Sequence, residues 1–133
     1  MKFKGIVLVL ALAAGAFAVA GTGGAAKPKP KPKPKPVLKN TTVLVSAFET
    51  SSGMSLKLSQ TTVPRGTVTF KVVNDGKLPH DLSFGDRIGK TAMLEAGQSG
   101  TVTIKFLKAG KYTFICTVEG HQEAGMIGVL TVK

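Results

Sequence analysis

One loop near the end of the chain carries three side chains of the kind that bind soft metals. It reads Cys116-Thr-Val-Glu-Gly-His121-Gln-Glu-Ala-Gly-Met126 and directly follows the run that starts at Tyr112. Thiolate and thioether sulfur favour Cu(I), and imidazole also accepts Cu(II). If the preceding run is a strand, alternation places Tyr112, Phe114 and Cys116 on one inward face, with the loop folded back over the thiol. We therefore expect Cys116, His121 and Met126 to converge.

The other histidine, His80, begins a separate segment that ends at Phe84, and the chain has two His and one Cys in all. In a sandwich this segment can lie beside the strand that ends in Cys116, which completes a His₂Cys plane with a weak axial thioether. A compromise geometry of that kind rearranges little between Cu(I) and Cu(II), so it suits electron transfer. The sequence predicts one copper ion per chain, bound by His80, Cys116, His121 and Met126, and no catalytic residues.

Rival interpretations of these residues are weaker. Taken alone, His80 would be structural, and Met126 would fill a gap in the core as we expect of Met54 and Met93. Zinc can bind a thiolate and two imidazoles, but structural zinc sites usually add a second thiolate or a third imidazole, where this chain offers a thioether. A two-copper centre with two bridging Cys, and multicopper oxidase sites with many His, are excluded by the counts of one Cys and two His.

The rest of the chain after residue 37 favours strands that could position such a site. Val and Thr are plentiful, and Gly, Pro and Asn-Asp-Gly turns separate short apolar runs, several of which alternate with a period of two. This pattern predicts an all-β, Greek-key β-sandwich of about seven or eight strands. The segment 87–94 is ambiguous and could hold a helical turn. The expected strands are 43–48, 54–59, 67–73, 80–84, 100–106, 111–116 and 127–132.

Two segments precede that domain. Residues 1–26 have two lysines, an apolar run and small residues in the order of a secretory signal peptide, and the run is also nearly long enough for an N-terminal anchor. Residues 27–36 repeat Lys-Pro five times, which predicts an extended polyproline II linker. This cationic linker could contact a membrane or an anionic envelope polymer, or have no partner at all. We expect an exported protein whose copper-binding domain is residues 37–133.

The formal charge of +11 does not indicate a nucleic-acid partner. Seven of the basic residues lie in the first 36 positions, so the domain has eleven Lys or Arg against seven acids, a balance of +4. These basic residues are scattered and no aromatic side chains alternate with them. The one cysteine cannot form an intramolecular disulfide, although the leader points to an oxidising compartment.

From about residue 40 to 133 the chain resembles the cupredoxins, the blue-copper family, and among them small single-domain members such as plastocyanin, auracyanin and rusticyanin. The resemblance rests on Pro79-His80, the run 110–116, the Cys-x₄-His-x₄-Met loop with a glycine before His121 and before Met126, and the closing strand 128–132. It implies that both histidines bind through Nδ1, Cys116 binds as thiolate and Met126 is the long axial ligand.

The residue after the first histidine departs from that family pattern. Many cupredoxins carry Asn there, which ties the two ligand-bearing segments together, whereas this chain has Asp81. The departure puts in question the hydrogen bonding near the thiolate, and with it the reduction potential. An ionised Asp81 close to the metal would favour Cu(II).

The resemblance implies a one-electron carrier of the cell envelope, in the periplasm or on the outer face of the membrane, and not an enzyme. We expect a monomer with transient redox partners such as cytochromes or oxidases. They would dock where the edge of His121 reaches the surface in a small apolar patch formed by Leu78, Pro79, Ala124 and Met126. The alternative is an envelope protein that scavenges or delivers copper without redox turnover.

Overall fold

The computed structural model describes residues 15, 21, 23–24 and 27–133, and in this part of the chain all regular structure is β. None of the described residues forms a helix of the length and hydropathy that crossing a lipid bilayer requires. The all-β prediction is therefore confirmed, with seven strands. They are β1 (Lys39–Thr50), β2 (Gly53–Leu58), β3 (Thr62–Val63), β4 (Gly66–Asn74), β5 (Ser99–Phe106), β6 (Gly110–Ile115) and β7 (Ile127–Val132).

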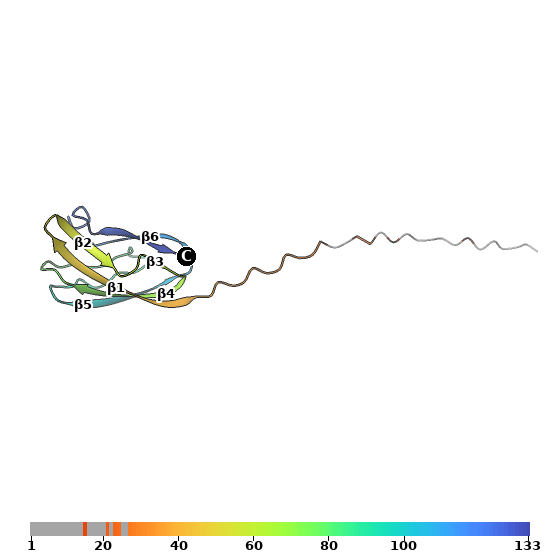
Figure 1. The fold of residues 1–133 in the computed structure, drawn as a ribbon, viewed down its shortest axis with the longest axis horizontal. Helices are drawn as coiled ribbons and strands as arrows, with labels where there is room; N and C mark the ends of the chain where they lie inside the picture. The colour runs from red at the N-terminus through yellow and green to blue at the C-terminus, as the bar shows by residue number, and fades with distance from the viewer. Residues whose placement is uncertain (1–14, 16–20, 22, 25–26) are drawn as a thin grey trace, which may run out of the picture. The chain divides into compact units, whose positions relative to one another are not determined.

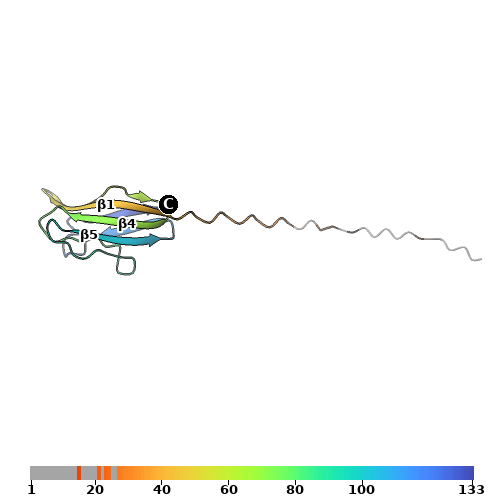
Figure 2. The ribbon, with the colours of Figure 1, turned by 90° about the horizontal axis from the view of Figure 1, so that it is seen from below.

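The strands form two sheets that pack as a sandwich (Figures 1 and 2). The larger sheet has the order β2-β1-β4-β5, and the smaller one has the order β3-β7-β6. β1 and β4 are parallel, as are β3 and β7, whereas the β1–β2, β4–β5 and β6–β7 pairs are antiparallel. Because β6 and β7 are antiparallel neighbours, the loop between them lies at the end of the sandwich opposite the C-terminus.

The same end also holds the turn from β1 to β2 and the chain that leaves β4. The backbone N–H of Met54, in β2, donates to the carbonyl oxygen of Ala124 at 2.8 Å, which joins the β1–β2 turn to the loop between β6 and β7. Ala47 near the end of β1 pairs with Asn74, the last residue of β4. Residues far apart in the sequence are thus gathered at one end.

The core between the sheets is built from the alternation that the sequence predicts. In β4, Val68, Phe70 and Val72 are fully buried, and the residues between them face outward. Aromatic rings connect the layers: Phe70 lies 4.9 Å from Phe84 between ring centroids, and Phe84 lies 5.8 Å from Phe114. Burial of each such side chain contributes roughly 1.5–3 kcal/mol to folding. This packing gives the two sheets a fixed relation to each other.

Six of the seven expected strands are present, and one is not. Residues 80–84 pair only at single positions, His80 with Leu94 and Ser83 with both Lys90 and Ile115. The segment folds back on itself, because Phe84 N donates to Gly89 O and the hydroxyl of Thr91 accepts from Leu82 N in place of a strand neighbour. The seventh strand is instead β3, whose two residues are too few to show alternation. The ambiguous segment 87–94 contains a hydrogen-bonded turn and no helix.

The expected signal peptide or anchor, residues 1–26, lies almost entirely outside the described residues. Residues 27–36, the Lys-Pro repeat, have no helix or strand and are exposed. Residues 34–133 form one compact unit.

Candidate metal centre

The loop between β6 and β7 is short and closes on itself through backbone hydrogen bonds. Cys116 N donates to Met126 O at 3.0 Å, and Met126 N donates to His121 O at 2.9 Å. Gly125 allows the loop to lie against β2, since its φ is +115° and a Cβ there would approach Met54 O to 2.7 Å. These hydrogen bonds place the backbones of Cys116, His121 and Met126 next to one another.

Alternation along β6 directs the thiol inward, as expected. Phe114 and Cys116 are buried, and Tyr112 is partly buried against the core. The segment continues from the sheet into the loop without a change of face. Cys116 therefore lies at the end of the core with only 1% of its surface exposed.

His80 reaches the same point from the long irregular segment between β4 and β5. Its backbone N–H donates to Leu94 O at 3.0 Å, and its carbonyl accepts from Leu94 N at 2.8 Å. The fully buried side chain of Asn74 holds the start of this segment, donating to Leu78 O at 2.7 Å and to Leu94 O at 2.8 Å and accepting from Gly76 N at 2.9 Å. The position of His80 thus depends on one isolated backbone pair and on the side-chain hydrogen bonds of Asn74, without a continuous strand ladder.

Three of the four predicted ligands come together. His80 Nδ1 lies 3.1 Å from His121 Nδ1, and Cys116 Sγ lies 3.6 Å from the same nitrogen. The candidate ligand atoms of all three residues are within 4.8 Å of one another. Ligand atoms each about 2 Å from one metal ion are separated by about 3–4 Å, so the spacing fits a metal ion between them. It is the one group of this kind in the described residues.

Met126 is fully buried, and its backbone is bonded to that of both Cys116 and His121. Its role as axial ligand stays a prediction. Burial also corrects the expected apolar patch, because Met126 contributes nothing to the surface. Leu78 is exposed and Pro79 and Ala124 are half-buried, so these three remain for the patch.

Burial shifts the pKa values of two candidate ligands, and only the shift of His121 favours metal binding. Burial, and next the neighbouring imidazole of His80, lower the pKa of His121, which favours the neutral ring that a metal requires. Burial raises the pKa of the Cys116 thiol, although hydrogen bonds from the backbone of Asp81 and Val118 act in the opposite direction. The thiol therefore releases a proton when a metal binds.

Asp81 ties the two ligand-bearing segments together despite its departure from the family pattern. One carboxylate oxygen accepts from Thr117 N at 2.6 Å, and the other accepts from Thr117 Oγ1 at 2.6 Å. Asp81 is 3% exposed. A buried carboxylate thus lies next to His80 in the sequence and is bonded to the residue that follows Cys116.

Sequence reasoning missed Glu49, at the end of β1. Its carboxylate accepts from His80 Nε2 at 3.0 Å and from the backbone N–H groups of Leu78 and Lys77. The backbone N–H of Leu78, followed by that of Lys77, lowers the pKa of Glu49 to about 2. No sequence signal joins Glu49 to His80, which lies 31 positions later.

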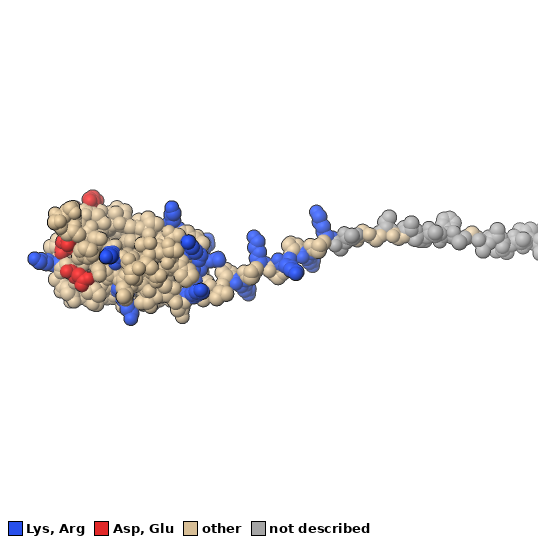
Figure 3. All heavy atoms as spheres, in the orientation of Figure 1, with Lys and Arg blue, Asp and Glu red and all other residues tan. Residues whose placement is uncertain are grey.

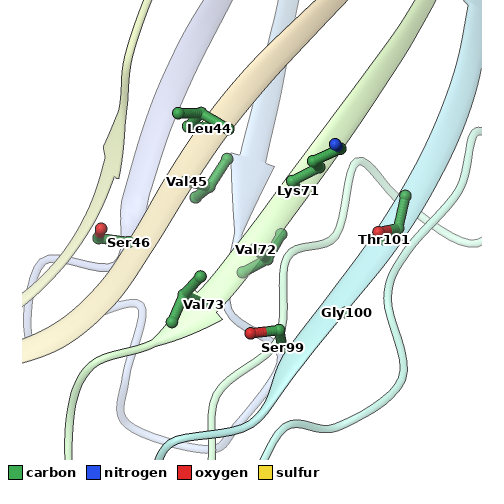
Figure 4. Close-up of a pocket in the computed structure, with 9 residues that line it drawn as sticks. All are labelled: Leu44, Val45, Ser46, Lys71, Val72, Val73, Ser99, Gly100 and Thr101. Carbon is green, nitrogen blue, oxygen red and sulfur yellow. The ribbon is translucent and has the colours of Figure 1, made fainter.

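A surface depression of about 400 Å³ lies elsewhere, across β1, β4 and β5 (Figure 4). Its lining includes Leu44, Lys71, Val73 and Ser99, and it contains neither histidine nor cysteine. The candidate metal ligands therefore lie at the end of the sandwich and not in this depression.

Comparison with known proteins agrees with this geometry. A model of the cupredoxin-like domain matches residues 10–132. Auracyanin-B of Chloroflexus aurantiacus is 57% identical over 42 residues, which cover 32% of this chain and 18% of that protein. The copper-resistant cuproprotein CopI of Rubrivivax gelatinosus is 33% identical over 92 residues, which cover 54% of this chain and 56% of that protein. The chain thus spans less than two thirds of either relative.

A solved structure of dithionite-reduced auracyanin from Roseiflexus castenholzii has the same fold. It gives a TM-score of 0.57 at 24% identity and covers 73% of this chain and 99% of that one. Because the family model spans most of the chain, the protein belongs to the cupredoxin-like family.

Proposed function

We propose that this protein is a one-electron carrier whose single copper ion is bound by His80, Cys116, His121 and Met126. The observation that carries the proposal is the convergence of two imidazole nitrogens and one thiol within 4.8 Å in a buried position. Copper is the cofactor of this family, and such a donor set suits both Cu(I) and Cu(II). When bound, the metal would supply the one-electron couple.

The protein residues would exclude water and keep the ligands in place. His80 and Cys116 are at most 1% exposed, whereas His121 keeps 7% of its surface exposed. The two segments that carry them are fixed by the sheets and by Asp81, so little movement would accompany a change of oxidation state. The small exposed part of His121 would give an electron a route to a partner.

Partners would dock at the end of the sandwich that carries the site. The acidic side chains visible in Figure 3 gather at this end, whereas Lys and Arg lie mainly toward the end near the C-terminus. Leu78, Pro79 and Ala124 supply an apolar surface there. We infer weak, salt-dependent docking of redox proteins such as cytochromes or oxidases, whose complementary surface is basic.

Copper binding without redox turnover is a second candidate. It is favoured by the similarity to CopI, which is named a copper-resistant cuproprotein. A scavenging or delivery protein would have to release its copper readily. The burial of the three candidate ligands favours retention, and therefore electron transfer.

An enzymatic role fits the chain less well. Copper enzymes that share this fold require a second metal centre built largely from histidine. Both histidines of this chain belong to the candidate site, and none is left for another centre. We propose a carrier and not a catalyst.

We propose that the protein is exported, with residues 1–26 as a signal peptide or anchor and residues 27–36 as a linker. The composition of the first segment supports export, and the five exposed lysines of the second suit contact with an anionic envelope surface. We expect the copper-binding domain to act as a monomer.

Repeated redox cycling distinguishes the two candidate functions. The copper-loaded full chain would be reduced with ascorbate and reoxidised with ferricyanide over many cycles, in the presence of a Cu(I) chelator. A carrier keeps its copper through the cycles. Loss of copper to the chelator after the first reduction would instead support delivery.

A further inference from the structure

Glu49 contacts the His80 ring on the side opposite the candidate metal. Its Oε1 accepts from His80 Nε2 at 3.0 Å, while Nδ1 of the same ring faces His121 at 3.1 Å. The Glu49 side chain is 26% exposed and that of His80 is fully buried. The carboxylate therefore closes the solvent side of a buried imidazole.

The position of this carboxylate is fixed by more than one bond. Oε2 accepts from Lys77 N at 2.9 Å, and Oε1 accepts from Leu78 N at 2.9 Å. Gly76 packs so closely that a Cβ there would lie 2.5 Å from Oε2. The Glu49 carboxylate is thus fixed by hydrogen bonds and packing to the segment that carries His80. Its contact with the His80 ring is therefore held in place.

The chemistry of this contact determines which ring nitrogen is free. An ionised carboxylate only accepts hydrogen bonds, so His80 Nε2 must carry the hydrogen. The lone pair of Nδ1 then points toward Cys116 and His121. A carboxylate bonded to the far nitrogen also makes an imidazole a stronger donor to a metal.

We propose that Glu49 is a positioning residue, which holds His80 with Nδ1 toward the copper and stabilises Cu(II) relative to Cu(I). The proposal rests on the function proposed above and deepens it, because it names a residue that sets the reduction potential. A purely structural role for Glu49, as an anchor of the Lys77 and Leu78 backbone, would affect both oxidation states equally.

The Glu49→Gln variant separates these roles. It removes the charge and one of the two acceptor oxygens but keeps the other, which can still accept from Leu78 N and His80 Nε2. Glu95→Gln is the matched control, because Glu95 is exposed and follows Leu94, the pairing partner of His80, but has no hydrogen bond to the ring among the described contacts. Cu(II) and Cu(I) affinities and the reduction potential would be measured on the full chain.

We expect the ratio of Cu(II) to Cu(I) affinity to fall about tenfold in Glu49→Gln, which equals a rise of about 59 mV in the potential of a one-electron couple. The Glu95→Gln control should change this ratio less than about threefold, since it removes an exposed charge that has no hydrogen bond to the His80 ring and is screened by solvent. Equal shifts in the two variants, or no shift in either, would overturn the proposal.

A measurement without metal tests the positioning of His80 separately from its effect on copper. Nitrogen-15 NMR of the metal-free full chain reports which ring nitrogen of His80 carries hydrogen. The proposal requires the Nε2–H tautomer in the wild type, and an Nδ1–H tautomer would overturn it even if Glu49→Gln did not fold. A wild-type chain that has this tautomer but forms no copper site would contradict the proposed function and leave the Glu49–His80 contact intact.

Discussion

The two segments that bring ligands to the centre are held in place in different ways. The loop 116–126 supplies Cys116, His121 and Met126 within eleven positions and closes through its own backbone hydrogen bonds. The segment 75–98 supplies only His80, and it is held by isolated backbone pairs together with the side chains of Asn74 and Glu49. The first arrangement is local, whereas the second depends on the assembled sandwich.

This difference indicates where the centre is vulnerable. A local loop keeps its shape as long as β6 and β7 pair, because its contacts lie close in sequence. A long segment without a strand ladder loses its shape more easily. Removal of one buried side chain that hydrogen-bonds several of its backbone N–H and C=O groups leaves those groups unpaired. We therefore expect the largest effects from substitutions that support His80.

Asn74→Ala should give the largest effect. It leaves the carbonyl oxygens of Leu78 and Leu94 and the N–H of Gly76 without the amide that they contact, so we expect a loss of about 3–4 kcal/mol in the free energy of unfolding. Urea unfolding of the metal-free full chain measures this loss. Asn40→Ala, at an exposed position of β1, is the control and should change stability by less than about 0.5 kcal/mol. Similar values for both variants would show that the long segment does not depend on Asn74.

Substitution of Asp81 tests the link between the two segments. Asp81→Ala removes both acceptors of Thr117, so we expect a loss of about 2 kcal/mol. Asp81→Asn keeps one acceptor for Thr117 N and can donate to Oγ1, so its loss should be below about 1 kcal/mol. Because it removes a negative charge, it should also raise the reduction potential. A potential that is unchanged in Asp81→Asn would show that this carboxylate does not act on the metal.

The smallest effect should come from glycines that adopt positive φ in open space. At Gly120, with φ +79°, and at Gly97, with φ +76°, an added Cβ would meet no atom within 4 Å, so alanine at either should cost about 1 kcal/mol in stability. Gly120 adjoins His121, whereas Gly97 lies far along the chain from His80. We expect Gly120→Ala alone to weaken copper binding, as measured by competition with a chelator. Equal weakening in Gly97→Ala would contradict the view that the short loop acts locally.

The sequence was most informative where the structure is local. Alternation in 67–73 and 100–106 predicted β4 and β5, and the spacing of Cys116, His121 and Met126 within one loop indicated a shared site. The inward direction of Cys116 followed from the period of two. Each of these inferences uses residues separated by fewer than about a dozen positions.

The remaining features depend on contacts that no local pattern encodes. The segment 80–84 was expected to be a strand, but a hydroxyl and single backbone pairs take the place of a ladder there. Asn74 was recognised as part of a turn, and its full burial was not. Glu49 gave no signal, because its role arises only when β1 and the segment 75–80 meet at one end of the sandwich.

The most direct test of the central claim is an absorption spectrum of the full chain titrated with Cu(II), with Cys116→Ser as the control. Our account predicts an intense visible band from thiolate-to-copper charge transfer that saturates at one copper per chain, bleaches with ascorbate and is absent in Cys116→Ser. A colourless wild-type protein, or a band that persists in Cys116→Ser, would contradict it.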